Sequence, residues 1–160
     1  MNRRVKSFLL AVLLLAPLAA VNGADAPKPP ARKPNIVVFL ADDMNWDYPG
    51  FNGGRCETPN LDRLAKEGTR LTQFYVHSVC SPTRAAFLTG RYPFHNGMEE
   101  RSHGNDVAGM LPDERTLAES LKQVGYDTAL IGKWHLGNYY QRQLPLQRGF
   151  DHHYGLYGAL

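Results

Sequence analysis

A cysteine in the middle of the chain stands directly before a segment with the pattern of a short helix. The segment reads Cys80-Ser81-Pro82-Thr83-Arg84-Ala85-Ala86-Phe87-Leu88-Thr89-Gly90. Ser81 is a favoured N-cap, Pro82 suits the first helical position, and Gly90 can end the helix in a left-handed conformation. We expect the amino end of this helix, with its unpaired N–H groups and positive dipole, to stabilise an anion beside Cys80. Arg84, one turn into the helix, adds a cation with several hydrogen-bond donors.

Two adjacent carboxylates follow an apolar run nearer the start of the chain. Residues 35–40, Asn-Ile-Val-Val-Phe-Leu, predict a strand buried on both faces in a parallel sheet. Asp42 and Asp43 come just after it, at the carboxyl end of the strand, where open α/β sheets bind ligands. Because the two like charges repel, a divalent cation that prefers oxygen ligands would stabilise the pair. For an isolated Asp-Asp pair the simpler alternative is a solvated turn.

A lysine and a histidine flank a tryptophan after another predicted strand. The strand covers residues 126–131, and Gly132-Lys133-Trp134-His135 follows it. In an extended segment Lys133 and His135 point to one side and Trp134 to the other, so one side presents two donors to an oxyanion. Standing alone, the segment indicates a lysine that extends its charge to solvent and a histidine in the core. Cys80 standing alone likewise indicates a buried structural thiol.

The order and spacing of these groups resemble the type I sulfatases. Cys80, Pro82 and Arg84, followed by a Thr-Gly turn, match the family signature Cys-x-Pro-x-Arg. The resemblance implies that a maturase converts Cys80 to formylglycine, an aldehyde. It also implies that Asp42 and Asp43, together with the modified residue at position 80, bind a divalent cation. Calcium is favoured over zinc because the ligands are carboxylates without a histidine cluster, and magnesium stays possible.

The segment around Lys133 resembles the second sulfatase signature. The resemblance implies that Lys133 contacts the sulfate, that His135 orients or protonates oxygens around formylglycine, and that Arg84 stabilises the developing charge. An ordinary serine that attacked sulfur would leave a sulfate ester on the enzyme that water removes slowly. A hydrated aldehyde has two hydroxyls on one carbon, so one can attack sulfur and the other can then expel sulfate and restore the carbonyl.

The resemblance implies a sulfuric ester hydrolase that acts on an aryl sulfate or a sulfated carbohydrate. Loop sequences such as Gln147-Arg148-Gly149-Phe150-Asp151 resemble the arylsulfatase B branch, whose members remove 4-sulfate from N-acetylgalactosamine in glycosaminoglycans. Two alternatives stay open: a phosphate or phosphonate ester hydrolase of the same superfamily, and an inactive secreted glycan-binding fragment. The family's later metal ligands and its further active-site lysine and histidine do not occur in these residues. We therefore expect the chain alone to be inactive.

The remaining periodic segments predict the elements that bring these groups together. They are a helix at residues 58–68, a strand at 69–76 and a helix at 116–124. We expect Leu61, Leu64 and Ala65 to form the packed face of the first helix. Thr116 and Glu119 form a capping-box pattern at the start of the second. The alternation of strands and helices favours an α/β fold with a mostly parallel sheet, and the resemblance implies the alkaline-phosphatase-like fold, incomplete in this chain.

The start of the chain has the layout of an export signal. Residues 1–26 combine a basic start, an apolar run and a small-residue cleavage site, and the run is too short to span a membrane. Arg3-Arg4 also permits a twin-arginine signal. Residues 27–34 read as a linker rich in proline and basic residues, and residues 35–160 as the amino-terminal part of a sulfatase catalytic domain. We expect an exported protein, periplasmic or secreted, or lysosomal in a eukaryote, without stable membrane insertion.

Charge and cysteine content narrow the range of partners. The net charge is +3, and the basic residues are interspersed with acids without a basic stripe, so nucleic-acid binding is not expected. The two cysteines, Cys56 and Cys80, are compatible with a disulfide in an exported protein, but that disulfide would remove the proposed nucleophile precursor. We therefore expect Cys56 to be free or paired beyond this segment.

Overall fold

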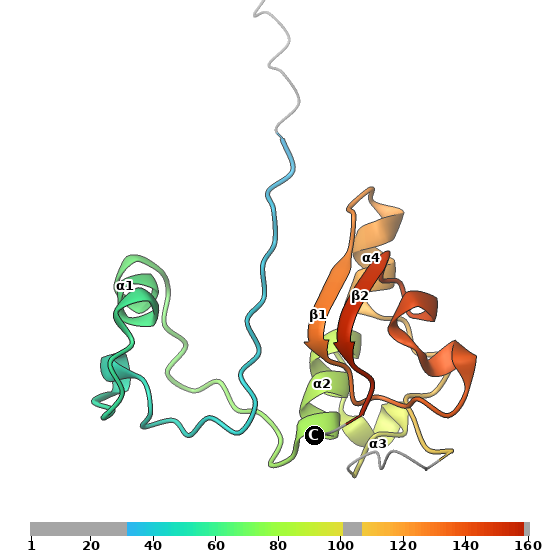
Figure 1. The fold of residues 1–160 in the computed structure, drawn as a ribbon, viewed down its shortest axis with the longest axis horizontal. Coiled ribbons are helices and arrows are strands. Elements are labelled where there is room, and N and C mark those ends of the chain that lie inside the picture. The colour runs from blue at the N-terminus through green and yellow to red at the C-terminus, as the bar shows by residue number, and fades with distance from the viewer. Residues whose placement is uncertain (1–31, 101–106, 159–160) are drawn as a thin grey trace, which may run out of the picture. The chain divides into compact units, whose positions relative to one another are not determined.

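The computed structural model describes residues 32–100 and 107–158 (Figure 1). The predicted signal peptide and most of the predicted linker lie outside the described residues. The chain divides into two units, Met1–Leu40 and Ala41–Leu160. Within the described part, we find no helix with the length and apolar composition needed to span a bilayer.

The strands predicted at residues 35–40 and 69–76 are not formed. Residues 35–40 are irregular, and residues 69–76 contain a turn; among the described residues neither segment pairs with a strand. Phe39 and Tyr75, which the pattern would bury, are exposed. The predictions failed because apolar β-branched composition favours an extended backbone, whereas a strand also needs a neighbour that completes its ladder of hydrogen bonds.

Helix α1 (Pro59–Glu67) forms where it was predicted, but its apolar face is not packed. Leu64 is 62% exposed, and the helix has no buried residue. Polar contacts instead join it to the 3-10 helix η1 (Gly50–Asn52). Asp62 accepts hydrogen bonds from the Phe51 N–H and the Thr58 hydroxyl, both at 2.8 Å, so Thr58 bonds a side chain rather than capping the helix backbone.

Helix α2 (Cys80–Thr89) begins earlier than the sequence pattern indicated. Its N-cap is Val79, which has an extended backbone, so Cys80 is itself the first helical residue. Ser81 is therefore not the cap, and its side chain is buried. The predicted end is confirmed, because Gly90 has a φ of 67° and donates its N–H to the carbonyl of Ala86 at 2.8 Å. A short helix that was not predicted, α3 (Pro93–Asn96), follows.

The predicted capping box opens helix α4 (Leu117–Gln123). The Thr116 hydroxyl accepts the N–H of Glu119 at 3.1 Å, and the Glu119 carboxylate accepts the N–H of Thr116 at 2.7 Å. These reciprocal bonds satisfy two backbone donors at the start of the helix. Gly125, with a φ of 80°, follows the helix end as expected.

Two parallel strands form the sheet. Strand β1 (Ala129–Lys133) lies slightly later than predicted, and β2 (His152–Leu156) was not predicted. The connection between them contains the 3-10 helices η2 (Gln141–Gln143) and η3 (Pro145–Gln147). Just before the two strands, the Asp151 carboxylate accepts the Thr128 N–H at 3.0 Å and the Thr128 hydroxyl at 2.9 Å. Hydrogen bonds from Lys122 and Thr128 lower the pKa of Asp151 to about 2.

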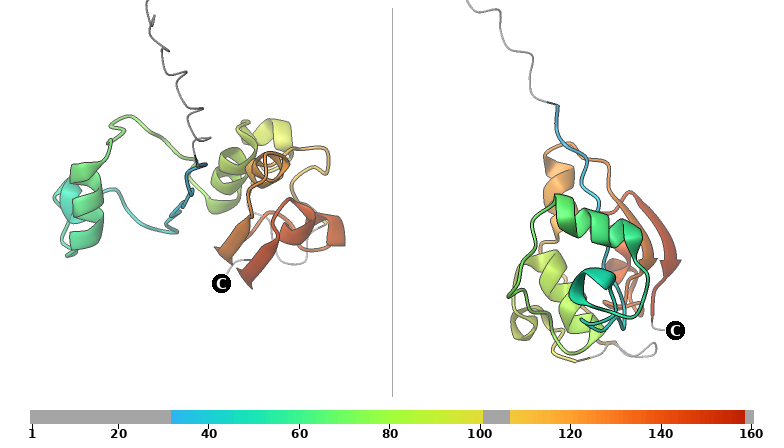
Figure 2. Two further views of the ribbon diagram at one scale, coloured as in Figure 1. Left: turned by 90° about the horizontal axis from the view of Figure 1, so that it is seen from above. Right: turned by 90° about the vertical axis from the view of Figure 1, so that its left-hand side faces the viewer.

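Helices α2, α3 and α4 lie on the same side of the two strands (Figure 2). Side chains from α2 and α4, from the segment that follows β1 and from the loops form one hydrophobic core. Its members are Ala85, Met98, Met110, Ala118, Trp134, Leu136 and Phe150. The chain is thus an α/β structure with a small parallel sheet flanked by helices, and the core lies between the helix that begins at Cys80 and the segment that follows β1.

Candidate active site

Cys80 occupies the amino end of α2 and contacts a histidine that is distant in sequence. Its Sγ atom lies 3.1 Å from Nδ1 of His135. Cys80 is half-buried, and both Cys80 and Cys56 are free thiols. Because the first N–H groups of a helix have no partner within the helix, a negative charge on the position-80 side chain is stabilised there.

His135 is held rigidly after the end of β1. It is 1% exposed, and its φ of 62° places it in the left-handed region, which is uncommon for a residue with a side chain. Its backbone N–H donates to the carbonyl of Tyr157 at 2.9 Å. The neighbouring Trp134 is also buried, and its indole N–H donates to the carbonyls of Gly137 and Gln143. The strand therefore ends at Lys133, and the predicted strand alternation does not extend to His135.

Asp42, Lys133 and Arg84 form a cluster of charges. The Asp42 carboxylate lies 2.7 Å from Lys133 Nζ and 3.7 Å from an Arg84 guanidinium nitrogen. Arg84 also donates to the backbone carbonyl of Lys133 at 2.7 Å. The hydrogen bond from Lys133 lowers the pKa of Asp42, with smaller contributions from the charges of Lys133, Arg84 and His135, against an opposing effect of burial. Arg84 thus connects α2 to the end of β1.

Arg84 retains donor capacity towards a ligand. Its side chain is 11% exposed, and its Nε atom is buried without a hydrogen-bond partner among the described residues. A buried donor of this kind is costly unless another acceptor satisfies it. An oxyanion is the acceptor that a guanidinium binds best.

Asp43 is exposed and contacts none of the other candidate residues in the described part of the chain. Its φ of 53° lies in the left-handed region, and the backbone bends at Asp42 and Asp43. Two neighbouring carboxylates supply oxygen donors of the kind that calcium and magnesium bind, so their chemistry fits a hard divalent cation. Within residues 32–100 and 107–158, no group of three or more His, Cys, Asp or Glu side chains is arranged to hold a metal. Asp42 and Asp43 therefore fit as part of a cation site.

The structure brings five of the six predicted site residues into direct contact. The contacts form one pair, Cys80 with His135, and one cluster, Arg84 with Lys133 and Asp42. The two groups are joined because Cys80 and Arg84 belong to α2, and because Lys133 ends β1 and His135 follows it two residues later. Packing thus brings together five residues that are distant in the sequence, and their role as a site stays a prediction.

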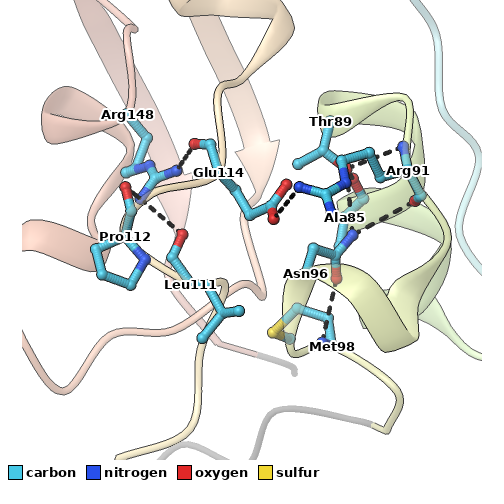
Figure 3. A network of polar contacts seen from close by, with 9 residues as sticks. All are labelled: Ala85, Thr89, Arg91, Asn96, Met98, Leu111, Pro112, Glu114 and Arg148. Carbon is cyan, nitrogen blue, oxygen red and sulfur yellow. Dashed lines mark hydrogen bonds and ion pairs between the residues drawn. The ribbon is translucent and has the colours of Figure 1, made fainter.

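A polar network around two buried charged residues, Glu114 and Arg148, was not predicted (Figure 3). Glu114 is 6% exposed; its carboxylate accepts a hydrogen bond from Arg91 at 2.7 Å, and its backbone carbonyl accepts one from Arg148. Arg148 is also buried and donates to the carbonyls of Leu111 and Pro112. No local pattern marks a single charged residue in a loop as buried, so the sequence carried no signal for this network.

The same network links the loop before α4 to both halves of the site. The N–H of Leu111 donates to the carbonyl of Asn96 in α3, and the N–H of Met110 donates to the carbonyl of Leu136, directly after His135, both at 3.0 Å. Asn96 in turn donates to the hydroxyl of Thr89 at the end of α2. Residues 110–116 therefore brace α2 against the segment that carries His135.

The amino-acid sequence is similar to that of a known protein family. The profile of the sulfatase family matches residues 34–159. Arylsulfatase G of Rattus norvegicus is 47% identical over 128 residues, which cover 79% of this chain and 24% of that protein. N-acetylgalactosamine-6-sulfatase of Canis lupus familiaris is 42% identical over 154 residues, which cover 90% of this chain and 28% of that protein.

The fold agrees with the sequence comparison. The crystal structure of Ps i-CgsB in complex with k-i-k-neocarrahexaose has a TM-score of 0.71 and 38% sequence identity, and the match covers 75% of this chain and 27% of that one. The chain therefore spans about a quarter of the length of the proteins it matches.

Proposed function

From the premise that this chain belongs to the sulfatase family, we propose that the whole protein is a sulfuric ester hydrolase whose reactive residue stands at position 80. The observation that carries the proposal is the 3.1 Å contact between Cys80 Sγ and His135 Nδ1. It joins the two segments that resemble the sulfatase signatures, although 55 residues separate the two side chains. A structural thiol would not need a buried histidine beside it at a helix amino end.

Position 80 is proposed to carry formylglycine, made from Cys80 by a maturase. When present, this aldehyde supplies, as its hydrate, a nucleophile that can later expel sulfate. The amino end of α2 stabilises negative charge on the side chain at this position. His135 holds or transfers a proton through Nδ1, the atom that faces position 80.

Arg84 and Lys133 are proposed to bind the sulfate oxygens. Both side chains are largely buried and both carry a positive charge, so they stabilise charge that develops on the ester during cleavage. The unsatisfied Nε of Arg84 supports this role, since a sulfate oxygen would supply the missing acceptor. Lys133 would exchange part of its contact with Asp42 for the substrate.

A divalent cation is proposed to bind Asp42 and Asp43. Calcium fits the carboxylate ligands best, and magnesium fits them with a smaller coordination shell. The cation would supply positive charge beside the reacting ester.

The proposed substrate is a sulfated carbohydrate. Support comes from Ps i-CgsB, whose structure was solved with a neocarrahexaose, and from the resemblance to N-acetylgalactosamine-6-sulfatase. Removal of 4-sulfate from N-acetylgalactosamine is the finer proposal, carried by loop sequences resembling the arylsulfatase B branch. An exported location suits such a substrate, as the sequence of residues 1–26 predicts.

Two measurements on the whole protein, expressed with and without the maturase, test the proposal. Mass spectrometry of the peptide containing Cys80 is expected to show conversion of the CH2–SH side chain to an aldehyde. Assays in parallel with an aryl sulfate and an aryl phosphate are expected to show faster sulfate hydrolysis. The Cys80→Ala variant is the control, because it removes the reactive group and leaves the other site residues in place.

Three outcomes would contradict the proposal in distinguishable ways. Faster phosphate hydrolysis would indicate a phosphate or phosphonate ester hydrolase. Unmodified cysteine after expression with the maturase, without turnover, would indicate a glycan-binding protein. Turnover that persists in the Cys80→Ala variant would place the chemistry elsewhere.

A further inference from the structure

The turn that carries His135 has an unusual backbone. His135 has a φ of 62°, and Gly137, two residues later, has a φ of 108°. A residue with a side chain adopts the left-handed region at a cost, and it keeps that conformation only where neighbouring groups fix it. The 3.1 Å contact between His135 Nδ1 and Cys80 Sγ is made from this turn. The contact therefore depends on the groups that hold the turn in place.

The indole ring of Trp134 closes the turn. Its N–H donates to the carbonyl of Gly137 at 3.1 Å, so this hydrogen bond spans His135 and Leu136. The same N–H donates to the carbonyl of Gln143 at 2.9 Å, which ties the turn to the 3-10 helix η2. We call these two hydrogen bonds the indole clasp. The clasp joins the residue before His135 to the residue two positions after it.

The acceptors of the indole clasp are themselves fixed. Gln143 is 7% exposed; its side-chain oxygen accepts the N–H of Tyr140 at 3.0 Å, and its side-chain nitrogen donates to the carbonyl of Val107 at 3.1 Å. The backbone at Gly137 is closely packed, since a Cβ atom there would lie 2.9 Å from both Gln143 Cδ and the Cα of Gly109. The clasp therefore joins the turn to a well-anchored part of the fold.

Burial of Trp134 makes the indole clasp hard to replace. Trp134 is 1% exposed, and its ring packs edge to face against Phe150 with the centroids 6.1 Å apart. Removal of the indole N–H would leave two carbonyls without this donor in a buried place, which is costly. The backbone bond from the His135 N–H to the carbonyl of Tyr157, at 2.9 Å, would remain. Loss of the clasp should therefore loosen the turn without unfolding it.

We propose that Trp134 is a positioning residue for the reaction at position 80. Through the indole clasp it aims Nδ1 of His135 at the side chain that reacts. This inference rests on the proposed function. Because the clasp acts through His135, its loss should slow the chemical step and leave substrate binding nearly unchanged.

The first test compares kcat and KM for 4-nitrophenyl sulfate in the whole mature protein. Trp134→Phe keeps an aromatic ring and removes the indole N–H. We expect kcat to fall about tenfold, as for loss of one hydrogen bond, with KM within about twofold of the wild-type value. Met98→Ala is the matched control, because Met98 is 2% exposed in the same core and is not part of the clasp. It should lower the thermal unfolding temperature and leave kcat within about twofold.

An isosteric replacement separates the hydrogen bond from the shape of the ring. Benzothienylalanine incorporated at position 134 keeps two fused rings and puts sulfur where the indole has its N–H. It should reproduce the fall in kcat of Trp134→Phe, because both changes remove the same donor. Wild-type kcat with benzothienylalanine would overturn the inference, even if Trp134→Phe does not fold.

Alkylation of Cys80 gives a readout that does not need sulfate hydrolysis. In the whole protein expressed without the maturase, an imidazole that takes the thiol proton speeds the reaction of Cys80 with iodoacetamide. We expect His135→Ala to slow this reaction about fivefold or more, and Trp134→Phe to slow it about threefold or more. Met98→Ala should alkylate at the wild-type rate. Mass spectrometry of the peptide containing Cys80 measures each rate.

The outcomes distinguish this inference from the proposed function. Wild-type alkylation in Trp134→Phe, with slower alkylation in His135→Ala, would overturn the inference alone. Equal losses of kcat in Trp134→Phe and Met98→Ala would show that Trp134 only supports the fold. Equal alkylation in the wild type and His135→Ala would overturn the inference together with the proposed role of His135. Slower alkylation in Trp134→Phe, without any sulfate release by the wild-type protein, would support the inference and contradict the proposed function.

Discussion

Residues 41–79 and residues 80–158 hold the side chains of the candidate site by different means. The buried hydrophobic residues of the described chain all come from the second region, whereas in residues 41–79 only Pro49 is buried. Cys80 and His135 are therefore positioned by a packed core. We call residues 41–79 the open region, because so little of it is buried. Asp42 belongs to this region and is held by ion pairs to Lys133 and Arg84.

The difference suggests a division of roles. Packing is worth several kcal/mol for a large buried side chain, about 3–5 kcal/mol for a tryptophan truncated to alanine. An ion pair that is partly exposed to solvent contributes about 0–1 kcal/mol. The contact between Cys80 and His135 should therefore be nearly independent of ions. The position of Asp42 should respond to the charges around it, including a bound cation.

Loss of His135 should give the largest effect, because it removes from the packed region the group that we propose acts on position 80. In the whole protein, we expect His135→Ala to lower kcat by a factor of about 10² to 10⁴, the range typical of a general acid or base. Steady-state kinetics across pH measures this change. His95→Ala is the matched control, since His95 is exposed and lies on α3. Equal losses in the two variants would remove the distinction between a catalytic and a surface histidine.

Glu114→Gln should give a smaller loss, through stability and positioning rather than through the reaction itself. It weakens the bond to Arg91 and leaves a neutral group in a buried site, for a cost of about 1–3 kcal/mol. Thermal unfolding measures the loss of stability, and kcat measures the loss of positioning. Lys122→Gln is the control, because it breaks the more exposed pair with Asp151 and should cost less stability than Glu114→Gln. Equal effects would mean that burial does not strengthen the brace formed by residues 110–116.

Cation affinity tests the open region directly. Lys133 Nζ lies 2.7 Å from Asp42, so it competes with a cation for the same carboxylate. We expect Lys133→Met to bind Ca²⁺ about tenfold more tightly, since removal of a nearby like charge favours the cation by about 1–4 kcal/mol at this range. Asp42→Asn should bind more weakly. Isothermal titration calorimetry of the whole protein measures the Ca²⁺ affinity of each variant. Weaker Ca²⁺ binding by Lys133→Met would show that the lysine and the cation do not compete for Asp42.

Local rules predicted the helices better than the strands. The capping box at Thr116 and Glu119 and the end of α2 at Gly90 depend only on neighbouring residues, so the sequence indicates them directly. Strand β2 is polar and aromatic and was missed. Its formation depends on pairing with β1 and on the bonds between Asp151 and Thr128, which are distant in sequence. Residues 35–40 show the opposite case. They have the sequence pattern of a strand, but no strand among the described residues pairs with them.

Sequence reasoning named only part of the candidate site for a similar reason. Cys80, Arg84, Lys133 and His135 belong to two short motifs whose residue types indicate their chemistry. Glu114 and its partners belong to no motif, because burial of a charge is a property of the folded chain. The left-handed backbone of His135 was also missed, since strand alternation gave no reason to expect a turn there.

The smallest effect is expected on the apolar face of α1, and it tests whether residues 41–79 are as open as the structure shows. Leu64 is 62% exposed, so Leu64→Ala in this chain should change the free energy of unfolding by less than about 0.5 kcal/mol. Leu136→Ala is the matched control: it deletes the same atoms from a fully buried site and should cost about 2–5 kcal/mol. Urea titrations of the two variants measure both values. A comparable cost at Leu64 would mean that another surface covers this helix, and the contrast between the two regions would then be lost.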